Sequence, residues 1–71
     1  MKNKIKVLRA ERSWSQAKLA ELVGVSRNSI ISIENGRFDP SLPLAFAIAD
    51  AFELTIEEIF QRNAQSKDRN S

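Results

Sequence analysis

Apolar residues recur at helical spacing in two short stretches near the middle of the chain. Leu19, Leu22 and Val23 share one face of the first stretch, and Ile30 and Ile33 share one face of the second. Few residues separate the two stretches, so the link between them brings the two apolar faces together. The pattern predicts two short, packed helices whose polar side chains point outward.

Residues that commonly begin and end helices flank both stretches. Ser15 and Ser26 each stand just before a helical pattern, where a serine hydroxyl accepts a hydrogen bond from a free backbone N–H. Gly24 and Gly36 stand where the two patterns stop, and glycine adopts at little cost the left-handed conformation that ends many helices. The second helix is therefore predicted to run from about Arg27 to Asn35.

The sequence before these helices predicts another amphipathic helix over roughly residues 3–12, with Ile5 and Leu8 on its apolar face. Trp14 then precedes the next helix. An apolar residue in that position often packs on the fourth residue of the helix that follows. Trp14 is therefore predicted to pack on Leu19.

The sequence after them predicts two more helices. Ser41 begins one, with Pro43 in its first turn, and Thr55 with Glu58 forms a capping box for the other. Their expected inner faces are Ala45, Ile48, Ala49 and Phe52, and then Ile56, Ile59 and Phe60. No strand is predicted. The sequence thus favours an all-α bundle of five helices in one domain, residues 1–61, followed by a polar, disordered tail, residues 62–71.

Composition excludes several functions. Seventy-one residues make one small domain with little room for an enzyme cleft. The chain has no Cys and no His, which removes disulfides, thiolate chemistry, the commonest metal ligands and the usual general base. We therefore expect no enzyme, no cofactor and no metal site. The N-terminal lysines alternate with other residues and no long apolar run follows, so we expect a cytoplasmic protein without a membrane segment.

Charge is distributed unevenly along the chain. Residues 1–37 carry eight Lys/Arg against three Glu, a net charge of +5, whereas residues 38–60 carry five acidic residues and no base, a net charge of −5. One half would attract a polyanion and the other would repel it, which would orient the protein during approach. The alternative is an ordinary solvated surface.

Taken together, the sequence resembles the phage Cro/repressor-type helix-turn-helix family, also called Xre-like. The similarity extends from about residue 5 to residue 60. It rests on Leu8-Arg9, Ser15-Gln16, Leu19-Ala20, Gly24-Val25-Ser26, Ile30, Ile33-Glu34-Asn35-Gly36, Pro40-Ser41-Leu42, Ile48-Ala49 and Ile59-Phe60. The resemblance implies a compact, lambda-repressor-like five-helix bundle with a central helix-turn-helix. It also implies a sequence-specific regulator of transcription that binds double-stranded DNA, with repression as the expected role.

The resemblance assigns base-reading positions to the second helix of the motif. These are Ser26, Arg27, Asn28 and Ser32. The chemistry agrees, because arginine donates two hydrogen bonds to guanine and asparagine pairs with both hydrogen-bonding groups of adenine in the major groove. Arg27 is the first choice for specificity. For each of these side chains the alternative is a surface residue that touches at most phosphate.

The resemblance also assigns contacts with the DNA backbone, which fix register without choosing sequence. They fall on Gln16, Ser29, Asn35 and Arg37. Gln16 lies at the start of a helix, where free N–H groups also favour an anion. The alternatives are an ordinary first-turn residue for Gln16 and a residue that only helps to end its helix for Asn35.

Arg9 and Glu34 match positions that pair in the family, so we expect a partly buried ion pair between the first helix and the end of the third. The alternative is two separate surface charges. Three positions depart from the family pattern. Ile31 stands where a polar residue is usual, and three alternatives stay open for it: contact with a thymine methyl, packing on a neighbour, or exposure to solvent. Ala47 and Asp50 stand where basic residues are frequent.

One recognition helix touches few base pairs, so a homodimer on a palindromic site is expected. Its surface is expected on the acidic C-terminal helices, where Phe46, Leu54 or Phe60 supply an apolar patch. The alternative is that these residues belong to the core. Two rival functions stay open: an antitoxin-like DNA-binding protein that also binds a toxin, and a structural or engineered interaction domain with weak DNA affinity.

Overall fold

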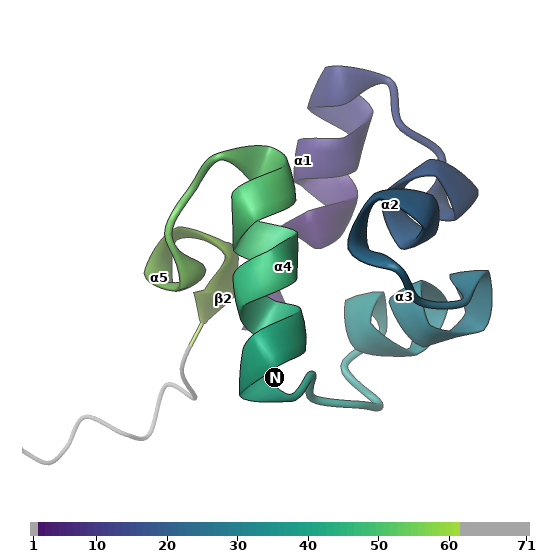
Figure 1. The fold of residues 1–71 in the computed structure, drawn as a ribbon. Helices are drawn as coiled ribbons and strands as arrows, with labels where there is room; N and C mark the ends of the chain where they lie inside the picture. Colours follow the sequence, from purple (N-terminus) through teal and green to yellow (C-terminus); the bar gives the residue numbers. More distant parts are fainter. Residues whose placement is uncertain (1, 62–71) are drawn as a thin grey trace, which may run out of the picture.

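The computed structural model describes residues 2–61 and contains five helices and two very short strands in that range (Figure 1). The elements in chain order are β1 (Lys2–Asn3), α1 (Ile5–Arg12), α2 (Gln16–Val23), α3 (Arg27–Glu34), α4 (Leu42–Phe52), α5 (Ile56–Ile59) and β2 (Phe60–Gln61). The predicted helical bundle is confirmed. The segment predicted as a tail, 62–71, lies outside the described residues. Within residues 2–61 no helix is long and apolar enough to cross a membrane.

The two strands correct the prediction that the chain has none. β1 pairs antiparallel with β2, Lys2 opposite Gln61 and Asn3 opposite Phe60. The backbone N–H of Lys4 extends this pairing with a hydrogen bond of 2.8 Å to the Ile59 carbonyl. The first helix therefore begins at residue 5 and the last ends at residue 59, each shorter than predicted, because the terminal residues pair with each other.

The predicted helix caps are confirmed. The hydroxyl groups of Ser15, Ser26, Ser41 and Thr55 each accept a hydrogen bond from a backbone N–H in the first turn of α2, α3, α4 and α5. Glu58 returns a hydrogen bond to the Thr55 N–H at 2.8 Å, which completes the capping box. Four of the five helices thus begin where a hydroxyl side chain satisfies a free donor.

One apolar core joins all five helices. Its buried members are Ile5, Leu19, Ala20, Ile30, Ile33, Ala45, Ile48, Ala49, Phe52, Ile59 and Phe60. The stripe predicted for α4 is confirmed in full. Leu22 was predicted to share the buried face of Leu19, but its side chain is 46% exposed, so the inner face of α2 is narrower than the spacing indicated.

Trp14 has a distant aromatic partner that the sequence did not predict. Its ring stacks on Phe52 of α4, with 5.3 Å between ring centroids, and it packs against the core that contains Leu19. Arg12 lies over the Phe52 ring at 5.0 Å and donates a hydrogen bond of 3.0 Å to the Phe52 carbonyl. These contacts fasten the ends of α1 and α4 together.

Candidate nucleic-acid interface

The turn between α2 and α3 is tight because Gly24 adopts a left-handed conformation, with φ of +79°. The N–H groups of Gly24 and Val25 both donate to the Ala20 carbonyl, at 2.8 and 3.0 Å. Only residues 24–26 separate α2 from α3. Ile30 and Ile33 of α3 are then buried against Leu19, as the apolar spacing predicted.

A polar cluster holds the far end of α3. The Arg9 guanidinium donates from Nε to Glu34 Oε2 at 2.5 Å and from Nη2 to Glu34 Oε1 at 3.3 Å. Gln16 donates to the same Oε1 at 3.1 Å, and Arg9 also donates to the Trp14 carbonyl at 2.8 Å. The Glu34 side chain is only 4% exposed. The expected ion pair is therefore confirmed, and it ties α3 to both α1 and α2.

The N-terminal strand adds a third tie to α3. Asn3 donates from Nδ2 to the Ile33 carbonyl at 2.8 Å, and its Oδ1 accepts from the Ile5 N–H at 3.2 Å. One amide thus satisfies a carbonyl near the end of α3 and a donor at the start of α1. The inner face and the C-terminal end of α3 are fixed, which leaves its outer face as the accessible one.

The residues expected to contact bases lie along this outer face. Ser26, Arg27 and Asn28 are exposed around the first turn of α3, and Ser32 is half-buried one turn further on. The Ser26 hydroxyl is partly occupied, because it caps α3 and lies 3.0 Å from the Ser29 hydroxyl. Arg27 and Asn28 therefore present the most accessible hydrogen-bonding groups of the four.

The residues expected to contact phosphate fall into two groups. Gln16 is half-buried at the start of α2 and bonds to Glu34, which brings it close to the end of α3, where Asn35 and Arg37 are exposed. Ser29 does not join them, because it bonds to Ser26 at the opposite end of α3. Gly36, just after the end of α3, adopts a left-handed conformation with φ of +77°.

Phe38 lies beside these residues and was not singled out in the sequence. Its side chain is 49% exposed and lines a hollow of 260 Å³ together with Asn28, Ser29 and Ser32. The backbone explains its position: the Gly36 N–H donates to the Ile33 carbonyl and the Arg37 N–H to the Ser32 carbonyl, so the chain folds back along α3. The signal in the sequence that could have identified Phe38 is an aromatic residue two positions after the glycine that ends the helix.

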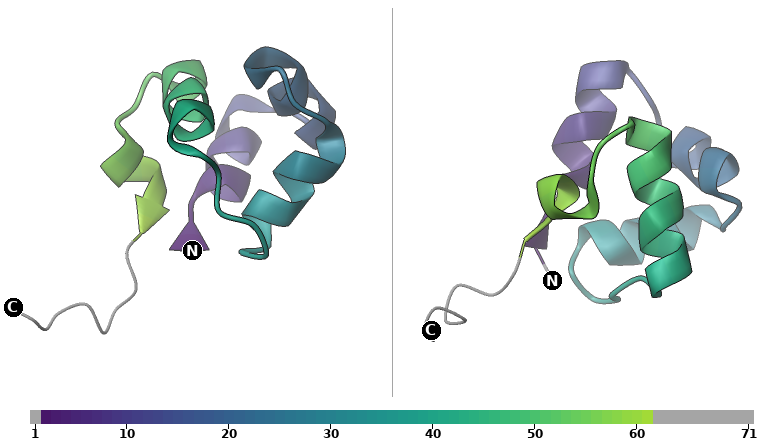
Figure 2. Two further views of the ribbon diagram at one scale, coloured as in Figure 1. Left: turned by 60° about the horizontal axis from the view of Figure 1, so that its bottom comes forward. Right: turned by 60° about the vertical axis from the view of Figure 1, so that its left-hand side comes forward.

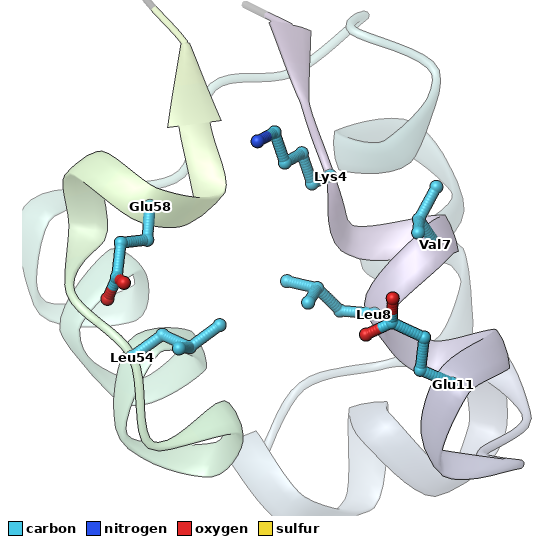
Figure 3. A pocket seen from close by; sticks show the side chains of 6 residues that line it. All are labelled: Lys4, Val7, Leu8, Glu11, Leu54 and Glu58. Atoms are coloured by element: carbon cyan, nitrogen blue, oxygen red, sulfur yellow. The ribbon is translucent and has the colours of Figure 1, made fainter.

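The charge division seen in the sequence is only partly a division in space. Pairing of β1 with β2 brings the N-terminal lysines beside the acidic C-terminal elements. A hollow of 540 Å³ between α1 and the α5 region shows this mixture: Lys4, Glu11 and Glu58 surround it, and Leu8 and Leu54 point toward one another across it (Figure 3). Its surroundings contain none of the expected DNA-contacting residues.

Glu58 in that hollow has a lowered pKa. The chief cause is the hydrogen bond from the Thr55 backbone N–H, followed by the bond from the Thr55 hydroxyl, with the charge of Lys4 contributing less. Each of these interactions favours the ionised carboxylate. The Glu58 carboxylate therefore stays ionised near neutral pH and serves as the partner of Thr55 in the capping box.

The C-terminal residues divide between surface and core. Phe60 is only 7% exposed and belongs to the core, so the expectation that it supplies an apolar surface patch is wrong. Leu54 is partly buried and packs against the core. Phe46 is 53% exposed. It lines a hollow of 440 Å³ between α4 and α5 with Ala49, Asp50, Leu54, Thr55, Ile56 and Glu57. Among the departures from the family, Ile31 and Ala47 are half-buried and Asp50 is exposed.

In Figure 1 and in the left view of Figure 2, α5 lies on one side of α4 and α3 on the other. The hollow beside Phe46 and the hollow beside Phe38 share no lining residue. One face of the molecule carries the exposed polar side chains of α3, and another carries the largely acidic α4–α5 surface.

Comparisons with known proteins agree with this arrangement. The helix-turn-helix family model matches residues 5–59. An uncharacterised HTH-type transcriptional regulator of Methanocaldococcus jannaschii is 55% identical over 60 residues, covering 84% of this chain and 91% of the relative. The uncharacterised HTH-type transcriptional regulator YgzD of Bacillus subtilis is 50% identical over 60 residues, covering 84% of this chain and 91% of the relative.

The solved structures agree as well. The restriction-modification controller protein C.AhdI from Aeromonas hydrophila superposes with a TM-score of 0.74 at 30% identity, covering 80% of this chain and 86% of that one. The capped α2–turn–α3 unit, the buried pair that locks it and these matches lead to one conclusion. The chain belongs to the Cro/repressor-type, Xre-like helix-turn-helix family of DNA-binding transcriptional regulators.

Proposed function

We propose that this protein is a sequence-specific repressor that inserts the outer face of α3 into the major groove of double-stranded DNA. The observation that carries the proposal is the exposure of Arg27 and Asn28 on the first turn of a helix whose other face and far end are fixed. A helix fits the major groove, and the first turn of such a helix meets base edges there. Occupation of a promoter by the domain would block transcription.

Each side chain has a distinct proposed role. Arg27 donates two hydrogen bonds to guanine, and Asn28 pairs with adenine. Ser26 and Ser32 contact bases through their shorter side chains. Gln16 has a second amide N–H besides the one it donates to Glu34, so its bond to Glu34 orients it while leaving a donor for phosphate. The remaining phosphate contacts come from Asn35 and Arg37, which are exposed beyond the end of α3, whereas the Ser29 hydroxyl is engaged with Ser26.

The test is selection of bound sequences from random duplexes at two salt concentrations. Sequence-independent phosphate attraction falls steeply with salt, whereas the base preference persists. Arg27→Ala should lose about 1–3 kcal/mol of discrimination at one base position and leave the other preferences intact. Arg37→Ala should weaken binding to all sequences alike and reduce the salt dependence.

Lys6→Ala is the matched control, because Lys6 is exposed on α1, outside the proposed interface, and its loss removes the same unit of charge. We expect the Lys6 variant to select the wild-type sequence. Selection of no sequence by the wild-type protein, or an unchanged preference in Arg27→Ala, would contradict the proposal.

We also propose that the protein binds DNA as a homodimer through the α4–α5 surface, with Phe46 as its apolar centre. Half-exposed Phe46 beside a hollow offers a self-complementary contact, and two copies would place two recognition helices about one helical turn apart. Phe46→Ser should shift the sedimentation coefficient of the DNA-free or DNA-bound protein toward the monomer. A wild-type chain that is monomeric with and without a two-half-site duplex would exclude the dimer.

A further inference from the structure

The hollow between the first two turns of α3 and Phe38 points to a recognition element that the hydrogen-bonding side chains do not account for. Three of its four lining residues, Asn28, Ser29 and Ser32, belong to α3, and the fourth is the exposed ring of Phe38. We propose that this hollow receives the C5-methyl group of a pyrimidine in the major groove, and that Phe38 is a specificity-determining residue. The inference rests on the proposed function.

The position of Phe38 is fixed by the backbone. Two hydrogen bonds, from the Gly36 N–H to the Ile33 carbonyl at 3.1 Å and from the Arg37 N–H to the Ser32 carbonyl at 3.0 Å, turn the chain back along α3. The left-handed φ of +77° at Gly36 makes this turn possible. The ring of Phe38 is thus held beside Ser32 rather than on a free loop.

The Phe38 side of the hollow suits a methyl group, while Asn28 and Ser32 line the rest with hydrogen-bonding groups. Phe38 supplies an aromatic wall that has no hydrogen-bonding group, and the Ser29 hydroxyl is engaged with Ser26 at 3.0 Å. Phe38 is half-exposed to water. Contact between its ring and an apolar group is favourable, because both apolar surfaces then leave the solvent.

The location selects the ligand. The hollow opens beside Asn28, which lies on the first turn of the helix proposed to enter the major groove. The one apolar group that base pairs display in that groove is the pyrimidine C5-methyl, present on thymine and on 5-methylcytosine and absent from cytosine. Ile31 does not line the hollow, so the proposed methyl contact there falls to Phe38.

The experiment replaces single methyl groups in the selected duplex. Each thymine is exchanged in turn for deoxyuridine, which keeps every hydrogen-bonding group, and each cytosine for 5-methylcytosine. We expect one position per half-site at which loss of the methyl group weakens binding by about fourfold, the effect of burying one such group. A thymine at that position identifies thymine as the source, and a cytosine whose methylation strengthens binding identifies 5-methylcytosine.

Phe38→Ala should bind the methylated and unmethylated duplexes equally at that position while keeping its other base preferences. Val7→Ala is the matched control, because Val7 is an exposed apolar residue on α1, 58% exposed and outside the interface. It should retain the methyl effect in full. Equal thermal unfolding of the Phe38 variant and the wild-type protein checks that the fold is intact.

Two results separate this inference from the proposed function. Sequence-specific binding in which no methyl substitution matters, or in which Phe38→Ala keeps the methyl effect, overturns the role of Phe38 and leaves the α3 interface standing. Absence of any sequence preference in the wild-type protein overturns both.

Discussion

The buried ion pair between Arg9 and Glu34 should contribute far more to stability than a surface pair. The Glu34 carboxylate is 4% exposed and accepts hydrogen bonds from two nitrogens of Arg9 and one of Gln16, and the Arg9 side chain is 13% exposed. Replacing Glu34 by leucine leaves the Arg9 charge buried with the Trp14 carbonyl as its remaining acceptor. We expect a loss of about 3–5 kcal/mol in the free energy of unfolding.

That loss would be large for a domain of this size. At about 0.05–0.15 kcal/mol per residue, a domain of this size would lose much of its total free energy of unfolding. Its thermal unfolding midpoint would fall by about 12 °C or more. The assay is urea unfolding of Arg9→Met, Glu34→Leu and the double variant, monitored by circular dichroism. The double variant should recover most of the stability, because two apolar side chains of similar volume leave no unpaired charge.

The neighbouring pair of Glu11 and Arg12 is a matched control. Its charged atoms are 3.8 Å apart and its side chains are 62% and 30% exposed. Its coupling energy in the same cycle should be about 0–1 kcal/mol, as for other exposed pairs. A coupling energy for Arg9 and Glu34 no larger than that of the control would refute the reasoning.

Two further predictions concern the turn and the last helix. Gly24→Ala should lower the free energy of unfolding by about 1–2 kcal/mol from backbone strain alone, because φ is +79° and an added Cβ meets nothing within 4 Å; unchanged stability in urea would contradict this. Because folding lowers the Glu58 pKa from its ordinary 4.5, its contribution to stability should be complete above that value and lost as the pH falls through the folded pKa. Acid titration of unfolding should show this component vanish in Glu58→Gln and persist in Glu57→Gln, whereas its survival in Glu58→Gln would exclude the capping box as its source.

Local signals in the sequence predicted much of the fold. Each hydroxyl cap was predicted because a cap and its donor lie within three residues, and the α4 stripe was predicted because its members share one face. The Arg9–Glu34 pair came from the resemblance, since nothing local links residues 25 positions apart.

The errors concern contacts between distant parts of the chain. The β1–β2 pairing joins the two ends of the domain through two residues each, too few to leave an alternating pattern. Leu22 has the spacing of a core residue, but no helix covers it fully. Phe38 looked like an ordinary loop residue, and only the reversal after Gly36 brings it beside α3.

The outer face of α3 as the DNA-binding surface is tested most directly by chemical-shift mapping. Amide spectra of the ¹⁵N-labelled protein would be recorded during titration with its selected duplex. We predict that the largest changes fall on the N-terminus of α2, on residues 26–32 and on residues 35–38. Changes concentrated on α4 and α5, with α3 unaffected, would contradict the account.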